Sequence, residues 1–419
     1  MRLLYTILLY LLSPLLLARL WWRGRRAPAY RRRWAERLAL YGGGRLDNSV
    51  WIHAVSVGEV LAAAPMIREL QARYPETPLV ITTTTPTGSE QVLKLFGDRV
   101  THVYCPWDLP DVLARFFRAF NPRLLLVMET ELWPNMLAAA HRRGVPSVLV
   151  NGRLSEKSWR NYGRFRALTT PMLARLTMVL AQTDVERERF IDLGVRPQAA
   201  NATGSIKFDI EIDPGLRERA EALRVEWSGR PVWLAASTHP GEDEQVLRAH
   251  QRVLGRHPDA LLVLVPRHPE RFDTVANQIA AAGLTVARRS TDQLVTAETS
   301  VYLADTMGEL LMLFGVCDLA FVAGSLVPVG GHNLLEPAAW GKPVLSGRHL
   351  HNFERIAGLL DEAGALTLVD DSEQLADTLT TLLADQDSLR RQGQAASELV
   401  AAHRGALARV LEELAPLWP

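Results

Sequence analysis

The chain has 419 residues, of which 48% are hydrophobic and 22% are charged, and its formal net charge is +1. This length favours two domains, the composition is that of a globular protein, and the near-neutral charge argues against a general nucleic-acid binder. The two cysteines, Cys105 and Cys317, suggest neither a disulfide framework nor a thiolate metal site, which fits a reducing compartment.

Residues 1–22 predict a membrane anchor. Most of this stretch is apolar, and it is about long enough to cross the roughly 30 Å hydrocarbon core of a bilayer, although Pro14 and Arg19 weaken the pattern. The basic segment 23–48 follows, and by the positive-inside rule its arginines place the rest of the chain on the cytoplasmic side of a single-pass anchor. The arginines either only set this topology or also form a cationic collar that meets an anionic lipid substrate.

From residue 49 the sequence predicts a parallel α/β architecture. Short apolar runs alternate with longer helical stretches, as expected for buried strands that are joined by helices. In the first half these runs are Val50–Val55, Leu79–Thr83, Val100–Tyr104, Arg123–Met128, Ser147–Val150 and Met178–Ala181. Functional side chains in such a sheet are expected at the carboxyl ends of the strands.

Polar segments follow several of these strands. Glu59 begins a predicted helix after a tight turn, and it either complements the helix dipole or acts as a general base. Glu129 and Glu131 follow the fourth strand, either as charges at a helix N-terminus or as part of a polar cleft wall. The hydroxyl run Thr82–Thr85 either caps a helix, which is the favoured interpretation, or binds an anion.

The predicted domain boundary lies between residues 212 and 213. A polar helix and the sequence Gly229-Arg230-Pro231 follow this point, and the strand–helix alternation then restarts. Lys207 precedes the boundary and either faces the space between two domains, where ligands often bind, or is an ordinary surface lysine. Phe353–Thr367 and Ser372–Leu414 are predicted to be mainly helical, and the last helix is a candidate to pack back on the first domain.

Strand ends in the second half also carry polar residues. They lie in Ser237–Glu242, Arg267–Arg271, Asp305–Leu310 and Phe321–Gly347. In the last stretch a glycine-rich loop leads into a helix expected near Asn333, so unpaired backbone N–H groups there form a candidate anion site. Glu336 can accept hydrogen bonds from a ribose diol, and Arg267 can bind a phosphate. The alternative is a glycine-rich turn of an ordinary α/β domain.

An ordered set of motifs along the chain resembles the Kdo transferases of Gram-negative lipopolysaccharide assembly (Kdo, 3-deoxy-D-manno-octulosonic acid). The motifs are SVGE, METELWPN, NGRLS, GSIKFD, STHPGE, VPRHPER, DTMGEL and VAGSLVPVGGHNLLEPAAWGKPV. The resemblance covers nearly the whole chain and implies a GT-B fold, in which two Rossmann-like domains face one another across a cleft. It assigns acceptor binding to residues 49–212 and CMP-Kdo binding to residues 213–419.

The same resemblance implies a reaction, its residues and its location. It implies inverting transfer of Kdo from CMP-Kdo to the lipid A precursor lipid IVA at the inner membrane, with no metal, no cofactor and no nucleic-acid partner. By motif, Glu59 corresponds to the general base, and Glu129 and Lys207 correspond to residues that stabilise the transition state. The residues that match CMP-contacting stretches are Arg267, His268, Met307, Gly308, Glu309, Asn333, Leu334, Leu335 and Glu336.

Two other functions remain open. A sugar-nucleotide epimerase on a similar scaffold would form its product without an acceptor lipid. A membrane-tethered nucleotide-binding protein without enzymatic activity would bind CMP but would never release it from CMP-Kdo.

Overall fold

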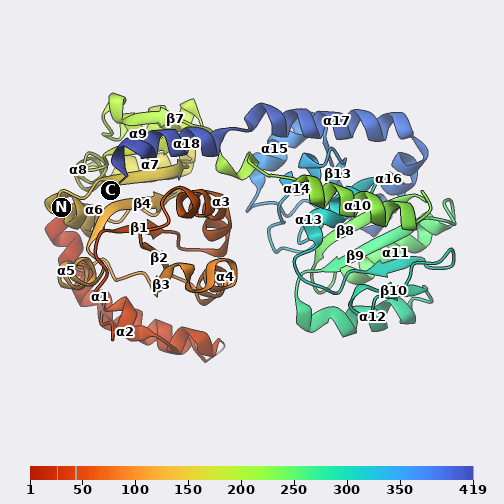
Figure 1. Ribbon diagram of the computed structural model, residues 1–419, viewed down its shortest axis with the longest axis horizontal. Coiled ribbons are helices and arrows are strands. Elements are labelled where there is room, and N and C mark those ends of the chain that lie inside the picture. Colours follow the sequence, from red (N-terminus) through yellow and green to blue (C-terminus); the bar gives the residue numbers. More distant parts are fainter. Residues whose placement is uncertain (26, 43–44, 419) are drawn as a thin grey trace. The chain divides into compact units, whose positions relative to one another are not determined.

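A computed structural model describes residues 1–25, 27–42 and 45–418 of the chain (Figure 1). It contains two compact α/β units. Unit 1 comprises Met1–Asp209 together with Arg404–Pro419, and unit 2 comprises Ile210–His403. The boundary predicted between residues 212 and 213 lies just after this division.

Unit 1 is built on a seven-stranded parallel sheet in the order β3-β2-β1-β4-β5-β6-β7. Its strands are β1 (Ser49–His53), β2 (Leu79–Thr83), β3 (Thr101–Tyr104), β4 (Pro122–Met128), β5 (Ser147–Gly152), β6 (Met178–Ala181) and β7 (Ala200–Ala202). All five residues of β1 are buried, and Ile52 lies opposite Ile81 on one side and Leu126 on the other. Burial on both faces explains why these strands read as continuous apolar runs.

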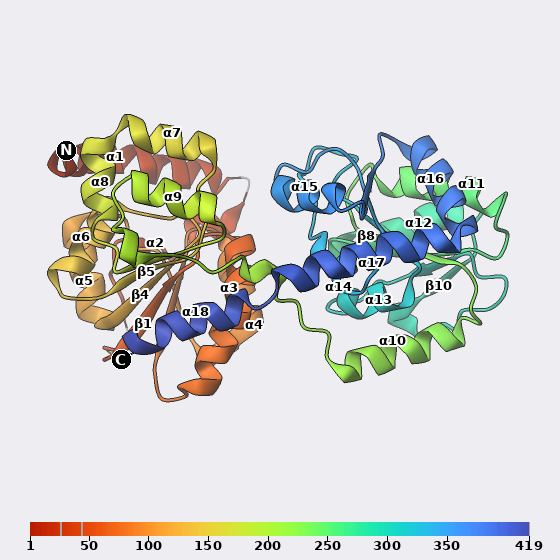
Figure 2. The ribbon, with the colours of Figure 1, turned by 90° about the horizontal axis from the view of Figure 1, so that it is seen from above.

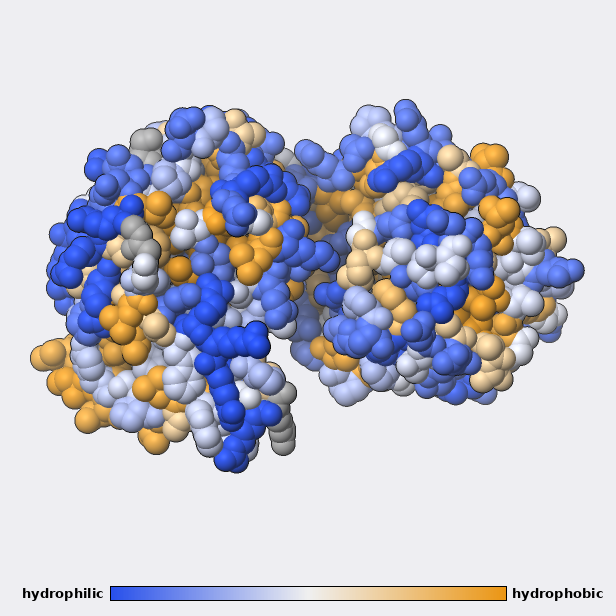
Figure 3. Space-filling view, turned by 60° about the horizontal axis from the view of Figure 1, so that its bottom comes forward, coloured by the Kyte–Doolittle hydropathy of each residue, from blue (hydrophilic) through white to orange (hydrophobic). Residues whose placement is uncertain are grey.

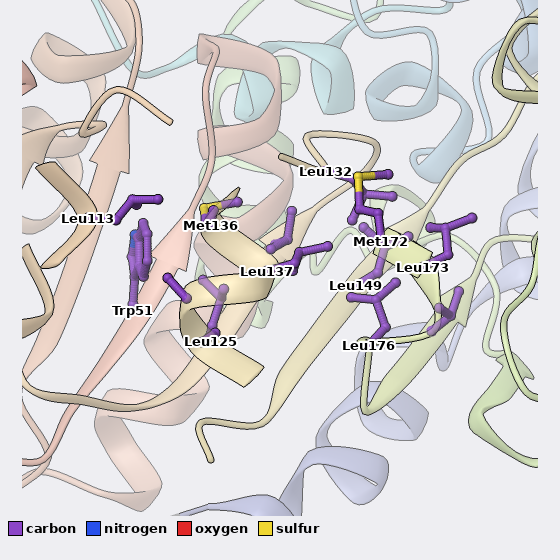
Figure 4. Packing of buried hydrophobic residues seen from close by; sticks show 14 of the residues in the cluster. Trp51, Leu113, Leu125, Leu132, Met136, Leu137, Leu149, Met172, Leu173 and Leu176 are labelled. Carbon is purple, nitrogen blue, oxygen red and sulfur yellow. The ribbon is translucent and has the colours of Figure 1, made fainter. Parts of the chain in front are cut away.

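Helices cover both faces of this sheet (Figure 2). They are α3 (Val57–Arg73), α4 (Pro86–Phe96), α5 (Pro110–Phe120), α6 (Pro134–Arg142), α7 (Glu156–Arg164), α8 (Arg166–Leu173), α9 (Asp184–Asp192) and α18 (Ala406–Leu414). Alternate residues of β1 point to opposite faces: Trp51 packs with α5 and α6, whereas Ile52 packs with α3 and α18. The ring of Trp51 lies 4.2 Å from that of Phe116, and Figure 4 shows this core.

The N-terminal segment forms α1 (Arg2–Arg23), a short turn at Pro28–Arg31 and α2 (Trp34–Arg37). Among the described helices, α1 is the one that is long and apolar enough to cross a membrane by length and composition. Its side chains contact unit 1 through polar groups, because the Tyr5 hydroxyl donates to Asp108 at 3.0 Å and Asn135 pairs with the Thr6 hydroxyl. Its leucines are largely exposed, so the apolar side of α1 faces outward.

Unit 2 repeats the design with the strand order β10-β11-β9-β8-β12-β13-β14, again fully parallel. Its strands are β8 (Val232–Thr238), β9 (Leu261–Pro266), β10 (Val286–Arg288), β11 (Val301–Leu303), β12 (Leu319–Val322), β13 (Val344–Ser346) and β14 (Leu366–Leu368). Its helices are α10 (Pro214–Glu226), α11 (Asp243–Leu254), α12 (Phe272–Ala281), α13 (Leu310–Val316), α14 (Leu335–Ala339), α15 (Glu354–Glu362), α16 (Ser372–Ala384) and α17 (Gln386–His403).

The prediction that Phe353–Thr367 is mainly helical was wrong at its end. After α15 the chain turns at Gly364, whose φ is +70°, and β14 then pairs with β13. A strand of three residues is too short to show a period in the sequence, so neighbouring strands and not local pattern determine it. The predicted hydroxyl cap is confirmed, because Thr85 precedes α4 and accepts from the N–H of Gly88 at 3.1 Å.

The C-terminal helix α18 belongs to unit 1, where it lies beside α3. The carboxylate of Asp209 holds its first turn, since its two oxygens accept from the N–H groups of Gly405 and Leu407, each at 2.6 Å. This pairing satisfies helix N-terminal donors and complements the helix dipole. The two chain segments that flank unit 2 in the sequence are thereby joined within unit 1.

We expect Asp209→Ala to lower the free energy of unfolding of unit 1 by about 2–3 kcal/mol, because hydrogen bonds to a charged group are lost together with a dipole contact. Urea unfolding monitored by circular dichroism measures this change. Glu412→Ala, an exposed position on the same helix, is the matched control and should change stability by less than about 0.5 kcal/mol. Equal effects of the two substitutions would contradict the anchoring role of Asp209.

Candidate functional site

Glu59 is held in the first turn of α3, directly after β1. Ser56 is the N-cap residue, and the Glu59 carboxylate accepts from the Ser56 hydroxyl at 3.0 Å and from the N–H of Val55 at 2.9 Å. The sequence SVGE thus forms a variant of the capping box, in which the residue at the third helical position reaches back beyond the helix start. Glu59 thus lies in the first turn of α3, as predicted, where its charge complements the helix dipole.

The electrostatics of Glu59 differ from those of an ordinary cap. Its side chain is only 9% exposed, and burial raises the pKa of Glu59 from 4.5 to about 7. The nearby charges of Glu129 and Glu131 contribute to this rise in the pKa, while the hydrogen bonds from Val55 and Ser56 oppose it. A carboxylate with a pKa near 7 can both accept and release a proton at neutral pH, as a general base must.

Glu129 and Lys207 form an ion pair at the carboxyl end of the same sheet. Lys207 Nζ lies 2.6 Å from Glu129 Oε1, and both side chains are mostly buried. Glu129 follows β4 and Lys207 lies in a short turn after β7, so the pair joins segments far apart in the sequence. The structure thus brings all three residues with predicted catalytic roles to the strand ends of unit 1.

Backbone strain marks the same region. Glu129 has a φ of +55°, and Asn151, near the end of β5, has a φ of +54°. Residues other than glycine pay for such conformations, which persist where the surrounding structure enforces them and which concentrate at functional sites. Here the Asn151 side chain accepts from the N–H of Ile206, next to Lys207, so the strained backbone supports the position of the lysine.

Unit 2 gathers cationic and titratable groups at the ends of β8, β9 and β12. His239 Nε2 and His332 Nε2 lie 2.8 Å apart with stacked rings, and His268 packs edge-on against His239. Burial is the main cause that lowers the pKa of His332 to about 3, and the charges of His239, Arg267 and His268 contribute to this lowering. Within the described residues Arg267 has no ion-pair partner at salt-bridge distance, so its guanidinium is a candidate to bind an anion.

The prediction that the N–H groups of the glycine-rich loop are unpaired and free to bind an anion was wrong. The N–H groups of Gly324, Ser325 and Leu326 all donate to the carboxylate of Glu242, at 2.7 to 2.9 Å. The same carboxylate accepts from the N–H of His239 at 3.1 Å, and Glu242 is fully buried. An internal carboxylate therefore fills the position that the loop pattern offers to a ligand.

The helix predicted to open near Asn333 is short and begins at Leu335. Asn333 caps it by accepting from the N–H of Leu335 at 3.1 Å, and its amide donates to Glu336 at 3.0 Å. Burial raises the pKa of Glu336, whereas the charge of Arg267 lowers it, so these two side chains lie near one another. Arg267, His268 and the Asn333–Glu336 segment thus converge, with Leu334 and Leu335 buried behind them.

Met307, Gly308 and Glu309 follow β11, the neighbour of β9. The carboxylate of Glu309 is engaged by Arg289, with oxygen–nitrogen distances of 3.0 and 3.1 Å, and also by Thr306. Met307 is 45% exposed, and Gly308 has a φ of +97°. This segment therefore offers an exposed backbone and an exposed thioether, while Glu309 orders the turn.

His239 and His332 were not predicted as site residues. They lie 93 residues apart, and only the pairing of β8 with β12 brings them together. Gly324 makes their contact possible, since a Cβ atom there would lie 2.9 Å from His332 Cδ2. The signal available in the sequence was that each histidine adjoins a turn after a strand.

Comparison with known proteins assigns the family. Residues 32–210 match the family described as 3-deoxy-D-manno-octulosonic-acid transferase (kdotransferase). The 3-deoxy-D-manno-octulosonic acid transferase of Haemophilus influenzae is 42% identical over 419 residues, which cover 99% of this chain and 98% of that protein. The chain belongs to the Kdo transferase family. The resemblance inferred from the motifs is thus confirmed.

Two solved structures show how far the fold of this Kdo transferase is shared. A UDP-GlcNAc 2-epimerase from Neisseria meningitidis is 16% identical, with a TM-score of 0.52 and coverage of 88% of this chain and 100% of that one. A glycosyltransferase from Rickettsia africae is 15% identical, with a TM-score of 0.54 and coverage of 88% and 99%. The predicted GT-B type, with two Rossmann-like domains, is confirmed.

The raised pKa of Glu59 has a consequence for stability. The folded chain keeps the Glu59 proton up to about pH 7, whereas the unfolded chain releases it near pH 4.5, so ionisation destabilises the fold progressively between these values. We expect Glu59→Gln to raise the free energy of unfolding relative to the native chain by about 1–3 kcal/mol at pH 8, and by much less at pH 5. Urea unfolding at both pH values tests this, with the exposed Glu76→Gln as control; a gain independent of pH would contradict it.

Proposed function

We propose that this Kdo transferase moves Kdo from CMP-Kdo to a lipid A precursor such as lipid IVA, with inversion and without a metal ion or other cofactor. The observation that carries the proposal is Glu59, a buried carboxylate at a strand end with a pKa near neutrality. Family membership supplies the sugar that is transferred, and the two clusters of polar residues supply the groups that such a transfer needs.

The reaction requires a base and a means to stabilise the leaving phosphate. Glu59 takes the proton of the acceptor hydroxyl as its oxygen forms a bond to the anomeric carbon of Kdo. The bond from that carbon to the phosphate oxygen breaks, and CMP leaves with the electron pair. Attack from the face opposite the leaving group inverts the configuration, and the developing negative charge calls for fixed cations or hydrogen-bond donors.

The Glu129–Lys207 pair fits the stabilising role proposed for it. An ion pair holds Lys207 in one position, so little reorganisation is needed when negative charge develops near the ammonium group. The charge of Glu129 raises the pKa of Glu59, which favours proton uptake by Glu59.

Unit 2 is proposed to bind the CMP part of the donor. Arg267 and His268 offer donors to the phosphate, and Glu336 with Asn333 offers acceptors and donors to the ribose. The exposed Met307–Gly308 backbone is the place proposed for the base. The histidine pair His239–His332 joins this set, because its imidazole nitrogens lie next to His268 and can form hydrogen bonds to a bound phosphate.

The epimerase alternative has less support. The epimerase structure shares the fold at 16% identity, and a fold hosts many activities. The 42% identity to a Kdo transferase over nearly the whole chain favours transfer to an acceptor, and an apolar N-terminal helix suits an acceptor that lies in a membrane.

We also propose that α1 attaches the enzyme to the inner membrane, with both units on the cytoplasmic side. The outward-facing leucines of α1 support this attachment, and exposed hydrophobic residues gather at one edge of unit 1 (Figure 3). The predicted single-pass arrangement would require α1 to leave its contacts with Asp108 and Asn135. Those contacts favour a helix that lies along the membrane surface.

Incubation with CMP-Kdo and the tetraacyl lipid A precursor, followed by mass spectrometry of the lipid, tests the reaction and counts the Kdo units added. We expect Glu59→Gln to lower kcat by about 10²–10⁴-fold and to leave the Kd for CMP within about threefold. For the native enzyme, kcat/KM should rise with pH to a plateau above about pH 7, because Glu59 must be ionised. Native turnover by Glu59→Gln would remove Glu59 as the base, and the exposed Glu76→Gln serves as control.

The position of α1 can be tested by labelling. In a chain whose two native cysteines are replaced by alanine, a cysteine at Leu3 should react with a membrane-impermeant maleimide only after the inner membrane is opened. This outcome is expected if the N-terminus stays on the cytoplasmic side. A cysteine at Leu93, exposed on α4, is the control for the cytoplasmic side. Labelling of Leu3→Cys in spheroplasts with an intact inner membrane would instead support the single-pass arrangement.

A further inference from the structure

A pocket of about 310 Å³ lies between α1 and the rest of unit 1. Leu16 and Leu20 of α1 form one wall, and Trp107, Leu109 and Trp133 are among the apolar side chains opposite. The polar residues that line it include three arginines, Arg19, Arg23 and Arg37. An apolar space bordered by cations suits a molecule that is both apolar and anionic.

Arg37 is a buried cationic side chain that lines this pocket. It is 6% exposed, its Nη2 donates to the carbonyl of Thr84 at 2.9 Å, and its guanidinium lies 4.2 Å from the ring centre of Tyr104. Its Nε atom is buried and has no hydrogen-bond partner, and no carboxylate in the described part of the chain forms an ion pair with it. The adjacent Glu36 is engaged by Arg33 and by the N–H of Tyr104.

The one acidic residue among those that line the pocket forms no ion pair with Arg37. Asp108 lines it too, but its carboxylate accepts from the Tyr5 hydroxyl and from the N–H groups of Asn135 and Met136. Arg37 therefore lines the pocket as a cation without a carboxylate partner, and its charge is best stabilised by an anion in the pocket. The pocket therefore calls for a ligand that carries negative charge.

The pocket is connected to Glu59 through two hydrogen bonds. The N–H of Thr84, a lining residue, donates to the carbonyl of Val55 at 3.1 Å, and the N–H of Val55 donates to the Glu59 carboxylate at 2.9 Å. Trp133 lines the pocket and lies in the same segment as Glu129. The pocket is thus linked to the segment that holds the proposed base.

A second apolar pocket adjoins the first. It has a volume of about 350 Å³, shares Trp133 with the first pocket, and is bordered by Tyr5 of α1 and by Phe165 and Met172. Two apolar spaces that share one tryptophan match a lipid with more than one acyl chain, and membrane phospholipids and the acceptor both have this feature. Proximity to Glu59 distinguishes the acceptor from bulk lipid.

We propose that the pocket covered by α1 binds an acyl chain of the anionic lipid acceptor and that Arg37 pairs with a phosphate of its headgroup. This inference rests on the proposed function and names the acceptor subsite. The acceptor carries a reactive hydroxyl, a phosphate and acyl chains in one molecule. The enzyme has one group for each of these parts: Glu59 is the base for the hydroxyl, Arg37 is the cation for the phosphate, and the α1 pocket is the apolar space for an acyl chain.

Two substitutions on α1 test the acyl-chain part. Leu16→Trp fills the pocket, whereas Leu15→Trp makes the same change at a neighbouring position that is 66% exposed and does not line it. With saturating CMP-Kdo, we expect Leu16→Trp to raise KM for the tetraacyl lipid A precursor at least tenfold and to leave KM for its deacylated disaccharide within threefold. Leu15→Trp should leave both values within threefold of those of the native enzyme.

Arg37→Gln tests the phosphate part, and Arg37→Lys is the conservative variant. We expect Arg37→Gln to raise KM for the phosphorylated acceptor at least tenfold but KM for the acceptor after phosphatase treatment by less than threefold. Arg37→Lys should recover most of the loss. A loss by Arg37→Gln that is equal on both acceptors would overturn the pairing with phosphate, and unchanged KM for CMP-Kdo confirms that the enzyme remains folded.

The outcomes separate this inference from the proposed function. Kdo transfer by the native enzyme with equal KM values for Leu16→Trp and Leu15→Trp would overturn the pocket and leave the transferase activity intact. Absence of transfer by the native enzyme would overturn the proposed function, and binding of the tetraacyl precursor in nanodiscs to both variants would then still test the pocket. Equal weakening by Leu16→Trp of binding to the precursor and to phosphatidylglycerol nanodiscs would assign the pocket to bulk lipid and overturn the proposal.

Discussion

A carboxylate buried in the first turn of α3 sets the conditions for the chemistry of unit 1. Glu59 closes the helix start through Ser56 and Val55, and hydrogen bonds of this kind stabilise the charged form. Burial and the neighbouring charges of Glu129 and Glu131 act in the opposite direction and prevail. The result is an acid held by the backbone whose proton is nonetheless exchangeable at neutral pH, and the neighbouring Glu129 is paired with Lys207.

The two sides of α1 bear on how the substrate reaches this site. A helix of apolar composition would normally turn most of its leucines toward a protein core, but α1 exposes most of them and contacts the rest of unit 1 through Tyr5 and Thr6 as well as through the few leucines that pack inward or line the pocket. The helix thus has an apolar outer surface and covers a pocket that contains a buried arginine. In the proposed function, attachment to a bilayer and selection of a lipid are both roles of this one element, which lies beside the strand ends of unit 1.

Much of the fold could be predicted because buried parallel strands are continuous apolar runs. Strands β2 and β6 match the predicted ranges, whereas β7, β10 and β14 have three residues each and owe their existence to neighbouring strands. The site was harder to predict because contacts across the sheet decide it. The pairing of His239 with His332 depends on β8 lying next to β12, and the sequence does not reveal that Arg37 is buried without an ion-pair partner.

The two units place a glutamate at equivalent positions after their first strands, but the two glutamates have different hydrogen-bond partners. In each, a Gly-Glu pair follows the first strand: Gly58-Glu59 after β1 and Gly241-Glu242 after β8. Glu242 accepts from four backbone N–H groups, three of which come from the Gly324–Leu326 loop after the neighbouring strand, so its charge is fully used within the fold. Glu59 accepts from one backbone N–H and one hydroxyl, so part of its hydrogen-bonding capacity is left for a substrate. Equivalent glutamates are therefore structural in unit 2 and chemically available in unit 1, and the loop that crosses the neighbouring strand end makes the difference.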